Sequence, residues 1–300
     1  MARQLGLFGA PGLDFSAERA LAAGLPPHVS FGTSSWTFPG WGNLVYPPGT
    51  TEADLLERGL ELYVRHPLFT TVGIDRSYYA PLDRSTLKRY AEQLPPGFRA
   101  VMKVWNAITQ AVDPKTREPN PRFLSVDCVV ERVLGPIDDA FAEHAGPLVF
   151  EFPPLRRREL PEPRAFADRL GEFFAKLPRQ LSYAVELRNP ELLSHGYLEV
   201  LAQHGVGHVL NFWQRMPDSG AQLDVPGVRT APFVVSRLLI PPGQSYEDRK
   251  RSLAPFDRVV DPQEKMRDDV ARLAEACEKL GKVLLVIVNN KAEGSSPLTV

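Results

Sequence analysis

An alternation of short apolar runs with amphipathic stretches fills the chain from residue 29 onward, and it constrains the fold more than any other feature. The apolar runs predict eight strands, at residues 29–35, 71–77, 99–105, 148–152, 182–188, 208–212, 233–239 and 282–289. The amphipathic stretches predict helices at 52–65, 85–93, 126–144, 163–176, 191–203 and 263–280, whereas 213–232 shows no clear helix. Strand–helix units of this kind favour a parallel sheet. Eight of them predict a single α/β domain with a TIM-like (β/α)₈ barrel.

The alternation also indicates how the chain is divided. We interpret residues 1–27 as an N-terminal extension, with a short helix capped by Ser16, and residues 28–300 as the barrel domain. Ser296 and Pro297 resemble a helix start, and Val300 follows directly. We therefore expect the eighth outer helix to be absent from this chain.

Composition excludes several classes of protein. A 43% hydrophobic and 24% charged chain with a net charge of −1 is typical of a globular protein and carries no overall basic field for nucleic acid or lipid. Cys128 and Cys277 are the only cysteines, which indicates neither a disulfide framework nor a zinc site. Neither a signal peptide nor a run long enough to span a membrane is evident. We expect a cytoplasmic protein with no membrane partner.

Two charges in the strand predicted at 182–188 point to a functional site. Side chains alternate along a strand, so Glu186 and Arg188 share one side with Ala184. Burying two charges is unfavourable unless they are paired or used. In a parallel barrel the carboxyl ends of the strands carry the active site. The alternative is a structural ion pair that closes the barrel mouth.

The same alternation predicts which side chains the other strands place at the mouth. They are Ser34 and Trp36, Asp75, Lys103 and Trp105, Glu151, Asn211, Arg237 and Asn289. Barrel layers are normally filled by aliphatic residues, so this many polar groups at strand ends indicates a site. The expectation depends on register, since a one-residue slip would turn every side chain outward.

Three roles follow from the residue types. Lys103, Arg188 and Arg237 form a candidate clamp for phosphate or carboxylate. Glu151 and Glu186 are candidate general acid and base, with Asp75 as a third catalytic carboxylate. Substrate-binding candidates also include aromatic walls and two amides: Trp36, Trp41, Tyr79, Trp105, Asn211 and Asn289. The alternative is a closed network in which each acid neutralises a base.

We expect no metal or cofactor. The six histidines fall at predicted strand starts, helix ends or loops, away from the strand carboxyl ends. Carboxylates alone can hold Mg²⁺, but three neighbouring cations would oppose it. Basic runs at 156–158 and 249–251 are mixed with acids, which is typical of a solvated rim, with a nucleic-acid groove as the alternative. The segment 241–246 begins a long loop that we interpret as a lid.

Several motifs resemble one known family. In chain order they are residues 32–36, Trp41, 46–47, 72–75, Tyr78, Tyr79, Pro81, 102–103, 108–109, 150–154, 185–188, Arg237 and 289–290. Together they resemble the domain of unknown function 72, or YecE-like, family. The resemblance implies a TIM-like barrel and no agreed activity. Gly73, Asp75 and Glu151 stand where the family usually carries Glu, Asn and Gln.

A short N-terminal motif suggests a protein partner. Gln4, Leu5, Leu7 and Phe8 resemble the peptide by which bacterial polymerases and repair proteins dock on the DNA sliding clamp. A flexible tail can place such Leu and Phe side chains in an apolar groove. The alternative is a tail with no partner, since short motifs arise by chance.

Three functions remain open. The first is an enzyme acting on a phosphate-bearing substrate, including a nucleotide or nucleic acid. The second is an enzyme acting on a sugar or carboxylate with no link to DNA, which aromatic walls and paired carboxylates also suit. The third is a non-catalytic module that binds a small anionic ligand in the same mouth.

The tail motif leads to a direct prediction. Immobilised sliding clamp should retain the full chain. The Leu7→Ala/Phe8→Ala double variant should not be retained, because it lacks the two apolar side chains that would fill the groove of the clamp. Pull-down followed by quantitative blotting measures the ratio. Equal retention of both proteins, or of neither, would remove the argument for a DNA-associated role.

Overall fold

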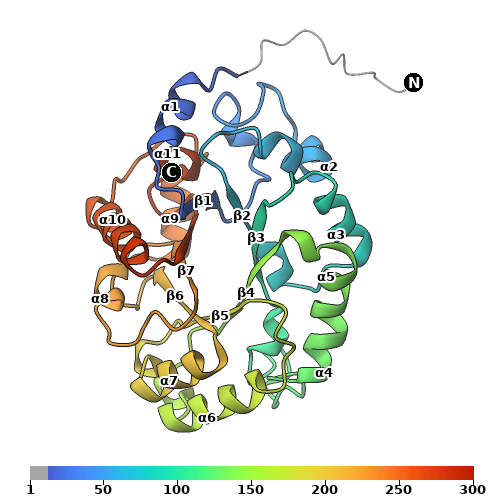
Figure 1. Cartoon of the computed structure of the whole chain (residues 1–300), viewed down its shortest axis with the longest axis vertical. Coiled ribbons are helices and arrows are strands. Elements are labelled where there is room, and N and C mark those ends of the chain that lie inside the picture. The colour runs from blue at the N-terminus through green and yellow to red at the C-terminus, as the bar shows by residue number, and fades with distance from the viewer. Residues whose placement is uncertain (1–12) are drawn as a thin grey trace.

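The computed structural model describes residues 13–300, and it has the predicted barrel architecture (Figure 1). Its eight strands are all parallel and run in the order β1-β8-β7-β6-β5-β4-β3-β2. Their bounds are β1 Val29–Thr33, β2 Thr71–Ile74, β3 Arg99–Lys103, β4 Ala145–Glu151, β5 Tyr183–Glu186, β6 Gly207–Phe212, β7 Phe233–Leu238 and β8 Val283–Val288. Every strand lies within three residues of its predicted start, because the apolar runs mark the buried backbone.

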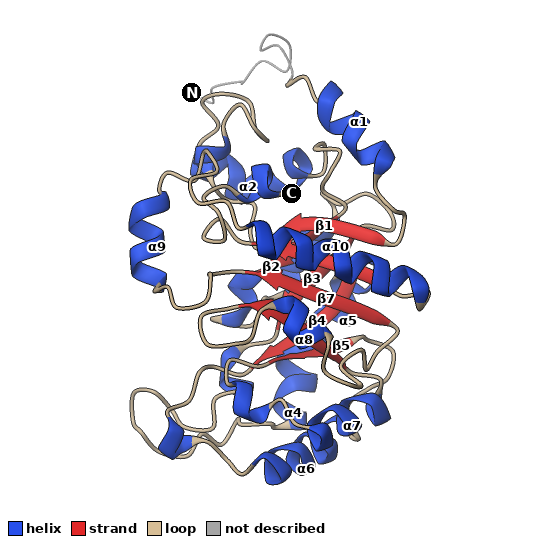
Figure 2. Cartoon of the chain, turned by 90° about the vertical axis from the view of Figure 1, so that its left-hand side faces the viewer, coloured by secondary structure: helices blue, strands red, loops and turns tan. Residues whose placement is uncertain are grey.

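Helices surround the strands and connect them (Figures 1 and 2). They are α1 Ser16–Gly24, α2 Glu52–Tyr63, α3 Arg84–Ala91, α4 Val126–Val129, α5 Gly135–Ala140, α6 Pro163–Phe174, α7 His195–His204, α8 Ser219–Leu223, α9 Tyr246–Leu253, α10 Glu264–Lys279 and α11 Ser296–Thr299. Figure 2 places α9 at the end of the barrel toward which the strand arrows point. Within residues 13–300, no helix has the length and apolar character needed to cross a bilayer.

Three helix predictions need correction. The stretch 213–232 contains α8, a short helix whose amide donors are capped by Asp218. The single helix predicted at 126–144 is α4 and α5 joined by a π-helical turn, Val130–Leu134. Ser16 is the first residue of α1 rather than its cap, and Asp14 accepts a hydrogen bond from its amide at 2.9 Å. The prediction for the segment after β8 agrees with the structure, since α11 begins at Ser296 and is a single turn within the described residues.

The interior of the barrel is a small apolar layer that sets the register. Val101, Val149, Ala184, Val209, Val235, Leu285 and Ile287 pack together there, one or two from each contributing strand. Because side chains two residues apart lie on one face, the next inward position of β3, β4 and β5 is Lys103, Glu151 and Glu186. The apolar layer therefore supports a layer of charged groups directly above it.

A tyrosine closes the seam where the two end strands of the sheet meet. The amide of Thr33 in β1 donates to Tyr63 Oη at 2.9 Å, and that hydroxyl donates to the carbonyl of Thr71 in β2 at 3.2 Å. The strands approach so closely that a Cβ on Gly32 would lie 2.1 Å from the Thr71 oxygen. Tyr63 thus satisfies two buried backbone groups that no ladder satisfies.

Tyr63→Phe tests this closure. Loss of the hydroxyl leaves a buried amide and a buried carbonyl without their partner, so the free energy of unfolding should fall by about 1–3 kcal/mol. Urea denaturation followed by circular dichroism measures the change. The matched control is Tyr79→Phe, because Tyr79 is 76% exposed, and it should stay within about 0.5 kcal/mol of the parent. Equal stability of both variants would show that the seam does not need the hydroxyl.

Candidate functional site

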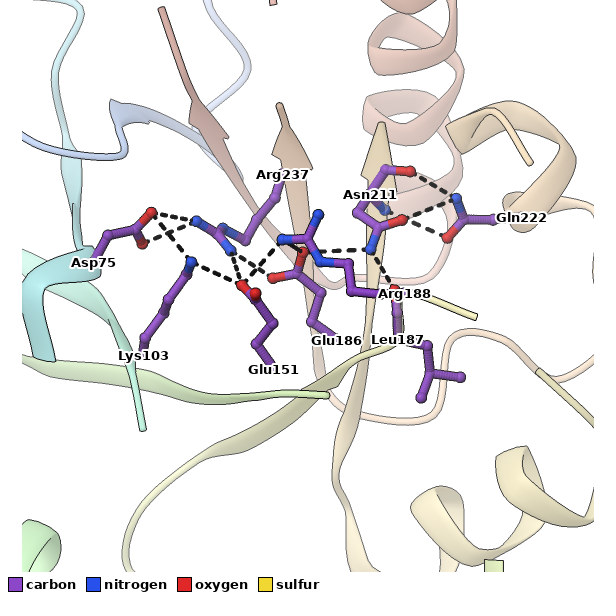
Figure 3. A network of polar contacts seen from close by, with 9 residues as sticks. All are labelled: Asp75, Lys103, Glu151, Glu186, Leu187, Arg188, Asn211, Gln222 and Arg237. Carbon is purple, nitrogen blue, oxygen red and sulfur yellow. Dashed lines mark hydrogen bonds and ion pairs between the residues drawn. The ribbon is translucent and has the colours of Figure 1, made fainter. Parts of the chain in front are cut away.

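Six charged side chains from five strand ends meet at the carboxyl end of the barrel (Figure 3). Lys103, Glu151 and Glu186 are the last residues of β3, β4 and β5, and Arg237 lies within β7. Asp75 begins the 3₁₀ turn after β2, and Arg188 lies two residues beyond β5. The register shows Glu151 beside Glu186 and Asn211 beside Arg237. The side chains expected to converge from the alternation therefore do converge.

Arg237 is the centre of this ionic cluster. Its Nη1 lies 2.5 Å from Glu186 Oε2 and 3.2 Å from Glu151 Oε2, and its Nη2 lies 2.6 Å from Asp75 Oδ2. The side chain is 1% exposed. Burial alone would lower the pKa of Arg237, but Asp75, Glu186 and Glu151 outweigh burial and raise it above its ordinary value. This guanidinium joins carboxylates from three different strands.

Arg188 and Lys103 complete the cluster. Arg188 Nη2 lies 2.6 Å from Glu186 Oε1 and 3.0 Å from Glu151 Oε2. Lys103 Nζ lies 2.7 Å from Glu151 Oε2 and 3.4 Å from Asp75 Oδ2. Each acid therefore contacts at least two bases, as the alternative of a closed network requires.

The electrostatics limit what Glu151 can do. Burial would raise the pKa of Glu151, but Arg188, Lys103 and Arg237 together hold it well below its ordinary value. Glu151 is consequently ionised at neutral pH, and the same cations weaken it as a proton acceptor. This state does not fit a general acid, one of the two roles considered for Glu151 and Glu186.

Glu186 and Asn211 lie beneath the mouth and do not line it. Both are 0% exposed. Asn211 Nδ2 donates to Glu186 Oε1 at 3.3 Å and to the Leu187 carbonyl at 2.8 Å, and Gln222 Nε2 donates to the Asn211 carbonyl at 2.7 Å. Asn211 is thus a positioning residue, not the substrate contact we predicted, because its amide is used by the protein itself. Gln222, which lies outside the predicted strands, escaped the sequence reasoning.

Above the cluster lies a cavity of about 420 Å³, which we call the mouth cavity. Predicted residues that line it are Ser34, Asp75, Tyr79, Lys103, Glu151, Arg188, Arg237 and Asn289. Charged and aromatic residues that the sequence reasoning missed line it as well: Phe38, Arg76, Tyr78, Trp213 and Lys291. Trp213 and Lys291 lie beyond the ends of β6 and β8, where strand alternation no longer predicts direction. The predicted lid segment contributes Tyr246, the first residue of α9.

Three of the four predicted aromatic walls lie elsewhere. Trp41 is fully buried and donates from Nε1 to Asn290 Oδ1 at 3.3 Å. Trp36 packs edge-on against Tyr90 with ring centroids 5.1 Å apart. Trp105 faces the Arg122 guanidinium at 5.6 Å. β1 ends at Thr33 and β3 at Lys103, so strand alternation no longer directs Trp36 or Trp105 inward.

The mouth cavity has unused hydrogen-bond donors. Within residues 13–300, buried atoms without a partner include Arg188 Nε and Nη1, Trp213 Nε1, Asn290 Nδ2 and the Ser34 hydroxyl, all from residues that line the cavity. Lys291 Nζ lies 4.4 Å from the Tyr246 ring centroid, and no described carboxylate is within ion-pair distance. Buried donors without partners are unfavourable unless something accepts from them. The lining is therefore complementary to a ligand rich in acceptors.

In the described part of the chain, no group of three His, Cys, Asp or Glu side chains is placed to hold a metal ion. Gln4, Leu5, Leu7 and Phe8 lie outside the described residues.

The fold and the site together define a (β/α)₈ barrel with an ionic cluster at its carboxyl mouth. The family model described as "Protein of unknown function DUF72" matches residues 30–300, so the chain belongs to this family. No curated protein matches the sequence.

Solved structures of the same family share the fold. A DUF72 family protein from Enterococcus faecalis is 15% identical with a TM-score of 0.59, covering 90% of this chain and 93% of that chain. A DUF72 family protein from Thermotoga maritima is 17% identical with a TM-score of 0.57, covering 90% of this chain and 95% of that chain. At these identities the comparison concerns the fold alone.

Glu151→Gln tests the cluster. The variant keeps the shape of the side chain but removes the charge that faces three cations, so unfolding free energy at pH 7 should fall by about 3–5 kcal/mol. Because the folded pKa of Glu151 is lowered, the stabilisation is present above the unfolded pKa of about 4.3 and is lost as pH falls toward the folded value. The difference between parent and variant should therefore shrink below about pH 4.3.

Urea unfolding at a series of pH values from neutral to acid measures both effects. Glu278→Gln, at an exposed position of α10, is the matched control and should change little. A Glu151→Gln difference that stays constant with pH would contradict the ion-pair account.

Proposed function

We propose that the mouth cavity binds a small phosphate-bearing molecule. The observation that carries the proposal is a surplus of positive charge: five cationic side chains line the mouth cavity, and they face two carboxylates in the lining and Glu186 beneath it. The cations are Arg76, Lys103, Arg188, Arg237 and Lys291, and the carboxylates are Asp75 and Glu151. An oxyanion supplies acceptors for these donors and the negative charge that the lining lacks.

Arg188 is the best-placed recognition residue. One of its terminal nitrogens is held by Glu151 and Glu186, while Nη1 and Nε are free, and Figure 3 shows one terminal nitrogen turned away from the carboxylates. The guanidinium carbon lies 3.9 Å from the Trp213 ring centroid, so the planar group is packed on an aromatic face. A guanidinium fixed in this way can donate from its unpaired N–H groups to phosphate oxygens with little loss of freedom on binding.

The carboxylates support a catalytic version of the proposal. Asp75 and Glu151 line the same cavity as the cations, and their oxygens can orient a water molecule or a hydroxyl group by accepting its hydrogen bond. Phosphoryl transfer requires mainly positioning and charge stabilisation, which the cations supply. Glu186 acts through Arg188 and Arg237, because the solvent does not reach it. A binding module without turnover uses the same contacts, and detection of product separates the two.

Two further versions rest on other residues. The mouth cavity is also lined by aromatic side chains that can stack on a sugar: Tyr78, Tyr79, Trp213 and Tyr246. A sugar or carboxylate substrate is therefore the second candidate.

A nucleic-acid substrate would depend on the exposed basic run at 156–158 near the end of β4. Salt-dependent retention of oligonucleotides measures the contribution of this run to binding.

Lys291→Met tests phosphate recognition without breaking the cluster, because Lys291 is outside it. In isothermal titration with inorganic phosphate, the dissociation constant of the variant should be at least about tenfold larger than that of the parent. A change of about tenfold corresponds to the free energy of one charge-assisted hydrogen bond. Lys279→Met, at an exposed position of α10, should bind like the parent. Acetate and glucose, titrated in parallel, report the carboxylate and sugar alternatives. Absence of phosphate binding by the parent, or equal binding by Lys291→Met, would overturn the proposal.

A further inference from the structure

A second cavity, of about 560 Å³, lies beside the mouth and shares Arg188 with it. We call it the side cavity. It is formed by the loop after β3, the loop after β4, the first turns of α6 and the chain just past β5. Glu151 lines the mouth cavity while the next residue, Phe152, lines the side cavity. The ends of β4 and β5 thus form the boundary between the two spaces.

The walls of the side cavity are mainly apolar and firmly packed. Phe152 and Phe166 are both buried and contact each other edge to face with centroids 5.1 Å apart. Asn189 accepts from the Leu155 amide at 2.7 Å and donates to the Leu155 carbonyl at 3.2 Å. These two bonds tie the loop after β4 to the end of β5. The cavity is therefore held open by the fold and needs no ligand to form it, which is typical of small-molecule sites.

The charges around the side cavity match an anion as well. Arg117, Arg169 and Arg188 line it with Glu159 as the one acid among the described residues. Arg117 is paired with Glu159 at 3.3 Å, and the Arg169 guanidinium lies 4.8 Å from the Phe123 ring centroid. Arg188, only 4% of whose side chain is exposed, has two nitrogens without a partner. An uncharged apolar ligand would leave these nitrogens unsatisfied.

We infer that the ligand has two parts: an oxyanionic group that binds at Arg188 in the mouth cavity, and an aromatic group that occupies the side cavity. The inference rests on the proposed function and adds the substrate class, an aryl-bearing phosphate as opposed to a bare phosphate. Arg188 is the junction, because it lines both cavities and its unpaired donors can hold the phosphate next to the side cavity. The side cavity can hold a flat aromatic ring, because phenylalanine, proline and arginine side chains line it and their faces can stack on such a ring.

The experiment compares inorganic phosphate, phenyl phosphate and 1-naphthyl phosphate by isothermal titration. The parent should bind 1-naphthyl phosphate at least about tenfold more tightly than phosphate, with phenyl phosphate between them, as burial of apolar surface requires. Ala165→Trp places an indole in the side cavity from α6 and should abolish that gain while phosphate binding is unchanged. Val112→Trp obstructs the cavity from the loop after β3 and should act in the same way.

The control is Ala271→Trp, which makes the same change at an exposed position of α10 and should keep the aryl gain. Circular dichroism confirms that each variant is folded. Because the two obstructing substitutions lie in separate elements, one variant can still be tested if the other is unstable. If the parent binds phosphate but gains nothing from an aryl group, or if both obstructing variants keep the gain, this inference is wrong and the proposed function stands. If the parent binds neither phosphate nor its esters, the proposed function fails too.

Discussion

The Arg237 guanidinium is the interaction on which the carboxyl end of this barrel depends. A buried carboxylate or guanidinium is strongly unfavourable without a partner, because the interior cannot replace the water that would solvate it. Arg237 contacts Asp75, Glu151 and Glu186, and these acids come from three different strand ends. Each group is tolerated only because the barrel brings the others within reach. The ionic cluster is therefore a consequence of the closed barrel and also constrains how its strands are arranged.

The same cluster separates a structural side from a binding side. The carboxylates hold one nitrogen of Arg188 and most of Arg237, and Asn211 supports Glu186 from below. What remains outward is a set of donors, with Lys291 added from the loop after β8. In the function we propose, the acids orient the bases and the bases bind the anion. This division is compatible with balanced charge inside the cluster, because the unpaired donors lie outside its ion pairs.

Particular residues show where sequence reasoning succeeds and where it stops. Strand alternation, started from Glu186 and Arg188, correctly placed Lys103, Glu151 and Arg237 on the inner face, because a strand has one geometry that fixes every second side chain. It misplaced Trp36 and Trp105, which follow strands that have already ended. Beyond a strand end, loop backbone and local packing decide direction, so Trp41 could enter the core while Trp213 reached the mouth cavity. Gln222 and the lining of the side cavity come from helices and loops, for which the sequence offers no comparable periodicity.

The sequence by itself determined the barrel, the strands and the register, since the pattern of apolar and polar residues decides which backbone can be buried and which face turns inward. It also determined the family and the set of charged residues that meet. Only the tertiary structure decided which nitrogen faces which carboxylate, which donors stay unused, and that Arg188 stands between two cavities. Those properties depend on side-chain torsions and on contacts between loops far apart in the chain, and no local pattern encodes them.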